Sequence, residues 1–420
     1  MSGKTAVAVH LAPSKLTHSD TVGAWVVIGA GVTAALHVGK LSPALPALGE
    51  ALGVSLVQAG FLLSLVQLAG MTLGLLVGLS ADTLGLKRSM VAGLLLLALA
   101  SLLGGWARDA QALLLLRAVE GLGFLLVSMP APSLIRQLVP PARMSAMLGL
   151  WGAYMPLGTA LALLCGPLVI ARAGWEFWWW LLAGLTLLMA AGVLQRVPSD
   201  PQRKLATQPS PGAASGWWGR LRQTLRAPGP WLVALSFAVY SGQWLAVIGF
   251  LPTIYIQAGV AGGLSAVLTA LVAGVNMVGN IVSGRLLGRG VRPQRLLYIG
   301  FGVMGLGTLL AFFVWPLTPQ GEGLSSVLRF LAVLLFSMLG GMIPGTLFSL
   351  AVRLAPGEGT VSTTVGWMQQ WASIGQFAGP PLVAWVASQV GGWQWTWAVT
   401  GACSLAGLWL ARQLGRRSAR

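Results

Sequence analysis

Long apolar stretches without a single charged side chain dominate this sequence. Asp, Glu, Lys and Arg are absent from residues 51–81, 177–195, 296–321 and 330–352. Each of these stretches is long enough for one membrane-spanning helix, which needs about 20 mostly apolar residues. Two longer uncharged stretches, 227–284 and 359–411, can each hold two such helices. The glycine pairs Gly262–Gly263 and Gly391–Gly392 divide them, because glycine interrupts regular helices.

The same pattern over the whole chain predicts an all-α membrane protein with twelve transmembrane helices. The predicted ranges are 22–42, 54–78, 89–106, 111–135, 145–171, 176–195, 230–256, 264–286, 295–315, 327–351, 362–388 and 393–412. The first 20 residues lack the apolar core of a cleavable signal peptide. We therefore expect the first helix to be both insertion signal and structure.

The composition agrees with a membrane-embedded chain and excludes two other classes of protein. Hydrophobic residues make up 56% of the sequence and charged residues only 8%, whereas soluble globular domains carry roughly 25% charged residues. A water-soluble single-core protein and a disordered chain are both excluded on this ground. The two cysteines, Cys165 and Cys403, are too few for a disulfide framework or a zinc site, and we expect neither metal nor cofactor.

The net charge of +17 is distributed unevenly across the predicted membrane. Of the 26 Lys and Arg residues, 21 fall in segments on the side of the two termini and three on the opposite side. Because positive residues are enriched in cytoplasmic segments, both termini and the central loop are predicted to be cytoplasmic. The expected location is the plasma membrane, the inner membrane of a bacterium. This placement explains the basic charge without nucleic acid as a partner.

A polar stretch rich in Pro, Ser, Gly and Arg separates two halves of six predicted helices. The predicted divisions are an N-terminal bundle over 1–195, a cytoplasmic linker over 196–229 and a C-terminal bundle over 230–420. Leu45-Pro46 matches Leu251-Pro252 at an offset of 206, and Gly166-Pro167 matches Gly379-Pro380 at 213. Because each half has an even number of helices, the two halves have the same orientation. This predicts a parallel repeat with a pseudo-twofold axis along the membrane normal, whose halves rock around a central pathway. Since one chain contains both halves, we expect a monomer.

The loop between the second and third predicted helices resembles the signature loop of the major facilitator superfamily. The family pattern is Gly, three residues, Asp-Arg, one residue, Gly and then basic residues. The matching residues are Gly78, Asp82, Gly85, Lys87 and Arg88. Thr83 stands where the family has arginine, whereas the second-half copy carries Arg289. The resemblance implies that these residues form a cytoplasmic gate, which Asp82 supports near a helix N-terminus.

The fourth predicted helix carries a second likeness to this superfamily. Its sequence from Arg117 to Gly123 resembles the family motif Arg, two residues, Gln, Gly, one residue, Gly, with Glu120 in place of Gln. The antiporter motif of helix five is not convincingly present. The resemblance covers about 20–412 and implies a transporter with the family's fold, while it leaves the substrate open. A closer likeness to the cyanate and nitroimidazole-type bacterial members rests on no single motif.

Ionisable residues inside a membrane span are rare and indicate function. His37 and Lys40 lie three residues apart in helix one and share a face, which suggests an electropositive site for an anionic substrate. In the alternative, Lys40 extends to the outer interface and His37 is hydrogen-bonded in a packed seam. Arg117 and Glu120 are also three apart. They form either a plain intrahelical ion pair or a proton-coupling site in which Glu120 carries the proton.

Aromatic and amide side chains supply the uncharged candidates for substrate binding. They are Trp151, Tyr154, Tyr240, Gln243, Trp244, Asn276, Trp367 and Gln370. Trp151 corresponds to Trp367 under an offset of 216 residues, as a shared central cavity requires. The alternative for each candidate is packing or interhelical hydrogen bonding. The tryptophans at the starts of helices six and twelve, including Trp178 and Trp179, are expected to be anchors at the outer interface.

Together these observations predict a secondary transporter that moves a small solute by alternating access, coupled to protons, with an anion slightly favoured. Proton-coupled efflux of hydrophobic compounds is the alternative, which the aromatic, mostly uncharged second half supports. A membrane sensor derived from a transporter would need a soluble signalling domain, but the longest polar segment has 34 residues. The sequence contains no nucleotide-binding loop of Walker type and no nucleophile paired with a base, so enzyme activity is not expected.

Overall fold

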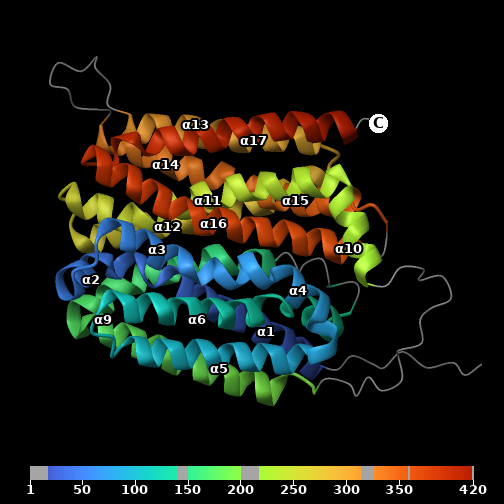
Figure 1. Cartoon of the computed structure of the whole chain (residues 1–420), viewed down its shortest axis with the longest axis horizontal. Helices are drawn as coiled ribbons and strands as arrows, with labels where there is room; N and C mark the ends of the chain where they lie inside the picture. The colour runs from blue at the N-terminus through green and yellow to red at the C-terminus, as the bar shows by residue number, and fades with distance from the viewer. Residues whose placement is uncertain are drawn as a thin grey trace, which may run out of the picture.

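The structure, a computed structural model, describes residues 18–140, 143, 147, 150–199, 217–313, 325–357 and 360–418. These residues contain helices and no strand. The long helices run along one common axis (Figure 1). This arrangement suits a lipid bilayer, because a helix satisfies its own backbone hydrogen bonds where no water is present.

The first half comprises the helices up to residue 196. They are α1 (His18–Gly39), η1 (Ser42–Ala44), α2 (Leu45–Leu52), α3 (Leu56–Ser64), η2 (Leu65–Gln67), α4 (Leu68–Leu84), α5 (Leu86–Gly104), α6 (Ala110–Ser128), α7 (Ala131–Leu138) and α9 (Tyr154–Arg196).

The second half follows the linker helix α10 (Trp217–Arg226). Its helices are α11 (Pro228–Gln257), α12 (Gly262–Gly288), α13 (Pro293–Phe312), α14 (Ser326–Gly340), α15 (Met342–Arg353), α16 (Val361–Val390), η4 (Trp393–Trp395) and α17 (Thr396–Ser418).

Nine stretches of the described residues are long and apolar enough to cross a membrane. One of them, α9, contains two predicted helices, because its helical geometry is interrupted at Gly174, whose φ of 86° favours glycine. The helices α16 and α17, with 30 and 23 residues, cover the last two predicted ranges. The predicted all-α membrane fold is confirmed, and twelve crossings are consistent with these helices.

Short 3-10 turns interrupt the helices of the first two spans. After α1 ends at Gly39, the chain forms a turn and the short helix η1 before α2. The second span divides into α3 and α4 at the 3-10 turn η2. Each break frees backbone carbonyl groups, which need polar partners inside the protein because lipid offers none.

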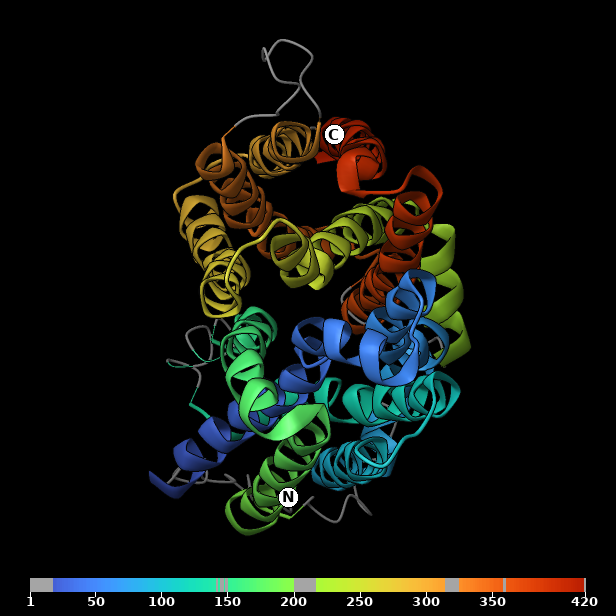
Figure 2. The ribbon, with the colours of Figure 1, turned by 90° about the vertical axis from the view of Figure 1, so that its left-hand side faces the viewer.

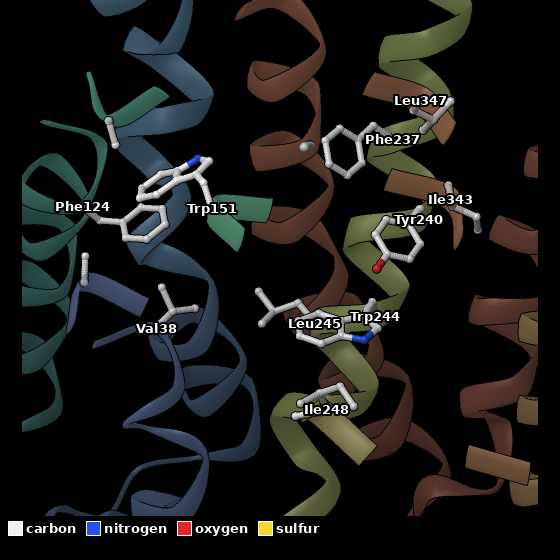
Figure 3. Packing of buried hydrophobic residues seen from close by; sticks show 14 of the residues in the cluster. Val38, Phe124, Trp151, Phe237, Tyr240, Trp244, Leu245, Ile248, Ile343 and Leu347 are labelled. Atoms are coloured by element: carbon white, nitrogen blue, oxygen red, sulfur yellow. The ribbon is translucent and has the colours of Figure 1, made fainter. Parts of the chain in front are cut away.

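The two halves form separate bundles that meet along several helices (Figure 2). In one contact α3 and α4 pack against α16, in another α9 packs against α12, and η1 also contacts α11. At Gly60 of α3, an added Cβ would lie only 2.8 Å from the Cα of Pro381 in α16, so the two backbones touch there. Buried apolar side chains continue from one bundle into the other (Figure 3).

The predicted linker 196–229 contains a helix that the sequence analysis did not predict. The helix α10 lies across the end of the bundle rather than along it (Figure 1). Its sequence combines aromatic and aliphatic residues with arginines, a pattern that is equally typical of a polar loop.

A buried charge cluster as the candidate functional site

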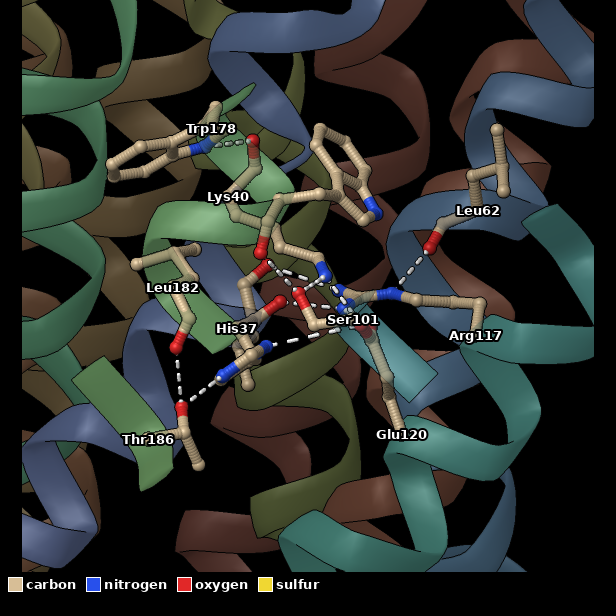
Figure 4. A network of polar contacts seen from close by, with 11 residues as sticks. His37, Lys40, Leu62, Ser101, Arg117, Glu120, Trp178, Leu182 and Thr186 are labelled. Atoms are coloured by element: carbon tan, nitrogen blue, oxygen red, sulfur yellow. Dashed lines mark hydrogen bonds and ion pairs between the residues drawn. The ribbon is translucent and has the colours of Figure 1, made fainter. Parts of the chain in front are cut away.

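The side chain of Glu120 in α6 is the centre of a buried ionic cluster (Figure 4). One carboxylate oxygen, Oε1, pairs with the ammonium of Lys40, and the other, Oε2, lies 2.8 Å from Nη1 of Arg117. Nδ1 of His37 lies 3.8 Å from Oε1. All four side chains are at most 2% exposed. The two residue pairs that the sequence analysis considered separately are therefore one cluster with a shared carboxylate.

Lys40 follows the last residue of α1 and is fully buried. Its ammonium donates a hydrogen bond to Oγ of Ser101 at 3.0 Å and lies 4.6 Å from the ring centre of Trp179, a cation–π distance. Its own backbone carbonyl accepts a hydrogen bond from Nε1 of Trp178 at 3.2 Å. The alternative in which Lys40 extends to the outer interface is therefore wrong, because its charge has partners inside the bundle.

Arg117 connects the two broken helices of the first half. Its guanidinium donates hydrogen bonds to the carbonyls of His37 and, at 3.1 Å, Val38, in the last turn of α1. Its Nε donates to the carbonyl of Leu62 near the end of α3 at 3.0 Å. These carbonyls belong to helix ends, which carry a partial negative charge. Arg117 therefore supplies the donors that the breaks in α1 and α3 require.

His37 is held on the opposite side of the cluster by α9. Its Nε2 lies 2.8 Å from Oγ1 of Thr186, whose hydroxyl donates to the carbonyl of Leu182 at 2.7 Å. The only proton of the Thr186 hydroxyl is donated to Leu182, so Thr186 accepts from His37 and Nε2 carries a proton. Nδ1 lies on the side of Glu120. The expected shared face of His37 and Lys40 is confirmed by their common neighbour, Glu120.

The cluster is electrically close to balanced without any added anion. The two cations, Lys40 and Arg117, face one carboxylate and the negative ends of α1 and α3, each equivalent to about half an elementary charge. A cavity of about 10 Å³ lies beside Lys40, Arg117 and Glu120, which is room for about one water molecule. This cavity offers little space for a solute.

A second polar network joins three helices of the other bundle. Nδ2 of Asn276 in α12 donates to the hydroxyl of Tyr240 at 3.1 Å and to the carbonyl of Ser337 in α14 at 2.8 Å. Nε1 of Trp244 donates to Oγ of Ser337 at 3.1 Å. Tyr240 and Trp244 in α11 therefore lie on one face of the helix, toward α12 and α14. Gln243 does not join them, because it accepts a hydrogen bond from Ser404 of α17 at 3.1 Å.

The remaining uncharged candidates lie at different places in the structure. Trp151 stacks on Tyr154 with ring centres 4.2 Å apart, and it lies across from Phe237 and Tyr240 of the other bundle (Figure 3). Trp367 packs edge-on against Trp231 of its own bundle, with ring centres 4.9 Å apart. Trp151 and Trp367, which correspond in the predicted repeat, therefore have different neighbours in the structure.

Gln370 binds the backbone of the other bundle. Its Nε2 donates to the carbonyl of Met71 at 2.8 Å, and its Oε1 accepts from the N–H of Leu75 at 3.2 Å. Both groups belong to α4, so Gln370 of α16 connects the two halves directly. In the structure, this residue, which was predicted to bind substrate, forms a contact between the two bundles.

The predicted gate residues are described in part. Gly85 joins α4 to α5 with a φ of 85°, which explains the need for glycine. Lys87 donates to the carbonyls of Leu194 and Val197 at the end of α9, at 2.9 and 2.6 Å. Arg88 is exposed at the start of α5, and Arg289 is exposed at the end of α12. The backbones of Gly78 and Asp82 lie in α4, while the side chain of Asp82 lies outside the described part of the structure.

Sequence reasoning missed four side chains that complete the cluster. Ser101 and Thr186 are small hydroxyl residues in apolar helices, and nothing in the local pattern distinguishes them. Trp178 and Trp179 were expected at the outer interface, but they are only 2% and 3% exposed. They lie on the part of α9 that follows Gly174 and faces Lys40, a packing relationship that the local sequence does not encode. Among the described residues, no group of three His, Cys, Asp or Glu side chains could hold a metal.

Comparison with known proteins agrees with this architecture. The family model described as Major Facilitator Superfamily matches residues 27–374. The puromycin resistance protein of Streptomyces alboniger is 28% identical over 80% of this chain and 62% of its own length. The cyanate transport protein of Escherichia coli is 24% identical over 55% of this chain and 58% of its own length. The matched part thus spans less than two thirds of these relatives.

Solved structures show the same fold at low sequence identity. A bacterial homologue of the human lysosomal transporter Spinster, crystallised in an inward-facing and occupied conformation, superimposes with a TM-score of 0.76 at 15% identity. The match covers 96% of this chain and 98% of that one. The matching family model, the helical architecture and this structural likeness agree: the chain belongs to the Major Facilitator Superfamily.

Proposed function

We propose that this protein is a secondary transporter, not an enzyme, that moves small uncharged hydrophobic compounds out of the cell in exchange for protons. The observation that carries the choice of substrate is the enclosure of Lys40. Its ammonium is fully buried and is paired with Glu120 and Ser101 beneath the ring of Trp179. A cation in this state is a poor receptor for an anion, because binding would require it to give up its carboxylate partner.

The side chains on the facing sides of the two bundles support the same choice. Val38, Phe124 and Trp151 lie on one side, and Phe237, Tyr240 and Trp244 lie on the other (Figure 3). Aromatic and aliphatic side chains with a few polar groups among them suit hydrophobic ligands. Names of relatives point in the same direction, since they include a chloramphenicol resistance protein and a tetracenomycin C resistance and export protein.

Glu120 is the proton carrier in this proposal. Protonation of its carboxylate removes the counter-charge of Lys40 and Arg117. Arg117 also holds the ends of α1 and α3, and α3 packs against α16 of the other bundle. A proton at Glu120 would therefore loosen the helix ends that contact the opposite half. This gives proton binding a physical route to the movement of the bundles.

The anion preference remains a prediction, and it would require Lys40 to exchange Glu120 for a substrate. We place the protein in the plasma membrane as a monomer, with both termini and α10 on the cytoplasmic side, because the basic residues favour that orientation. The predicted divisions at 196 and 229 are kept, with α10 assigned to the linker.

Transport by purified protein in liposomes tests the choice of substrate. We expect chloramphenicol, an uncharged aromatic compound, to dissipate an imposed proton gradient only when the protein is present. Cyanate, a small anion, should leave the gradient unchanged. If cyanate instead drives the proton flux and chloramphenicol does not, the anion alternative replaces the proposal.

A further inference from the structure

The helix α10 lies at the rim of the protein, at the end of the bundle that carries the C-terminus. Figure 1 shows it crossing the ends of the long helices, and Figure 2 shows it at the margin of the bundle beside α16. A helix in this position runs in the plane of the membrane surface, outside the ring of spanning helices. Lipid headgroups occupy that zone in a bilayer.

Two hydrogen bonds attach α10 to the second bundle. Nε1 of Trp231 in α11 donates to the carbonyl of Leu225 at 2.8 Å, and Nε2 of Gln223 donates to the carbonyl of Pro356 at 3.3 Å. Thr224 is fully buried. One side of α10 thus packs against the second bundle, so the opposite side of the helix faces away from the protein.

The other side of α10 carries an aromatic ring and two positive charges in one row. Trp218, Arg222 and Arg226 are spaced by four residues, so they lie one above the other along the helix. All three are exposed, Trp218 by 66%. The helix contains a third arginine, Arg220, and no acidic residue. A large exposed indole is unfavourable in water and favourable at the edge of a bilayer.

We propose that α10 is a membrane-surface anchor whose row Trp218, Arg222 and Arg226 binds the headgroups of anionic phospholipids. The indole would lie at the level of the glycerol backbone, and the guanidinium groups would each hold a phosphate. This combination of a tryptophan and arginines on an interfacial helix, without acidic residues, matches a negatively charged lipid surface. Since α10 is the last part of the linker and directly precedes α11, the anchor ties the start of the second bundle to the bilayer.

Hydrogen–deuterium exchange on the full chain in lipid nanodiscs tests this proposal. The peptide that covers residues 217–226 is compared in discs of phosphatidylcholine and in discs that contain phosphatidylglycerol. We expect exchange in this peptide to be slower with phosphatidylglycerol, by roughly fivefold, which is the effect of about one arginine near an anionic surface. The difference should shrink at high salt.

The variant Arg222→Gln/Arg226→Gln should lose this lipid dependence while its thermal stability in detergent is unchanged. The control Arg292→Gln/Arg295→Gln removes two exposed arginines near the start of α13 and should keep the lipid dependence at α10. Trp218→Ser should speed exchange in both kinds of disc. Equal exchange in both lipids for the unaltered protein, or a dependence that survives Arg222→Gln/Arg226→Gln, would overturn the proposal.

Discussion

The side-chain amide of Gln370 donates a hydrogen bond to the carbonyl of Met71, 299 positions earlier in the chain and in the opposite bundle, at 2.8 Å. Its oxygen accepts from the N–H of Leu75. Residues 71 and 75 are the carbonyl and N–H partners of one turn in an α-helix. One amide thus binds both ends of a helical turn across the boundary between the halves, and it does so only while the bundles hold this relative position.

Replacement of Gln370 by leucine should weaken this arrangement of the two bundles. Interhelical hydrogen bonds in membranes contribute about 0.6 kcal/mol each on average, so the loss of two predicts a destabilisation of about 1 kcal/mol. Thermal unfolding in detergent without substrate measures it. The neighbouring variant Gln369→Leu is the control, since no contact of Gln369 with α4 is described. If both variants unfold at the same temperature, the contact across the bundles does not stabilise this state.

Lys40 and Glu120 should be energetically coupled. Removal of one member of a buried ion pair leaves the other without a counter-charge, which costs roughly 3 kcal/mol or more. We expect Lys40→Met and Glu120→Gln each to destabilise the protein, and the double variant to be more stable than the sum of the two effects predicts. A double-mutant cycle of unfolding free energies provides the measurement. Purely additive effects would show that the two side chains do not act as a pair.

Arg117→Lys should reduce both transport and stability, although it retains the positive charge. A lysine ammonium is a compact donor and cannot reproduce the planar fork that reaches Val38 and Leu62 at once. We expect a lower yield of folded protein. The free energy of unfolding should fall by about 2 kcal/mol, because buried carbonyl acceptors are left unpaired. Arg108→Lys, at an exposed position, should have no effect. Wild-type stability of Arg117→Lys would contradict the bridging role.

Close backbone packing between α11 and α16 should not tolerate a methyl group at Gly375. An added Cβ there would lie 2.9 Å from the Cα of Ala238, which is closer than real contacts allow. Gly375→Ala should therefore cost about 1–3 kcal/mol through overpacking. Gly401→Ala in α17 is the matched control, because no atom lies within 4 Å of a Cβ added at Gly401. Size-exclusion profiles and melting temperatures measure the effect. A melting temperature of Gly375→Ala equal to that of Gly401→Ala would contradict the close packing.

The fold was predictable because its signal is periodic and local. Uncharged windows located the spans, and glycine pairs such as Gly262–Gly263 located their ends. The break between α3 and α4, inside the predicted span 54–78, was not predictable, because a leucine-rich sequence shows the same pattern in a straight helix and in a broken one. The helix α10 was missed for a related reason, since a short stretch of arginines and tryptophans next to proline and serine resembles a loop.

The candidate site was predictable in its charges and not in its partners. Rare ionisable residues in apolar helices identified His37, Lys40, Arg117 and Glu120. That both pairs share one carboxylate depends on how α1 and α6 pack, and Ser101 enters from a helix about 60 residues further along. The contact role of Gln370 likewise depends on the meeting of α4 and α16, which local sequence does not encode.

Proton flux through Glu120→Gln protein in liposomes tests the central claim most directly. The control Glu50→Gln alters an exposed carboxylate in α2. With chloramphenicol as the probe, we predict that Glu120→Gln abolishes substrate-driven proton flux while exchange of labelled for unlabelled chloramphenicol continues, and that Glu50→Gln retains both. Substrate-driven proton flux at the wild-type rate in Glu120→Gln would contradict the assignment of Glu120 as the proton carrier.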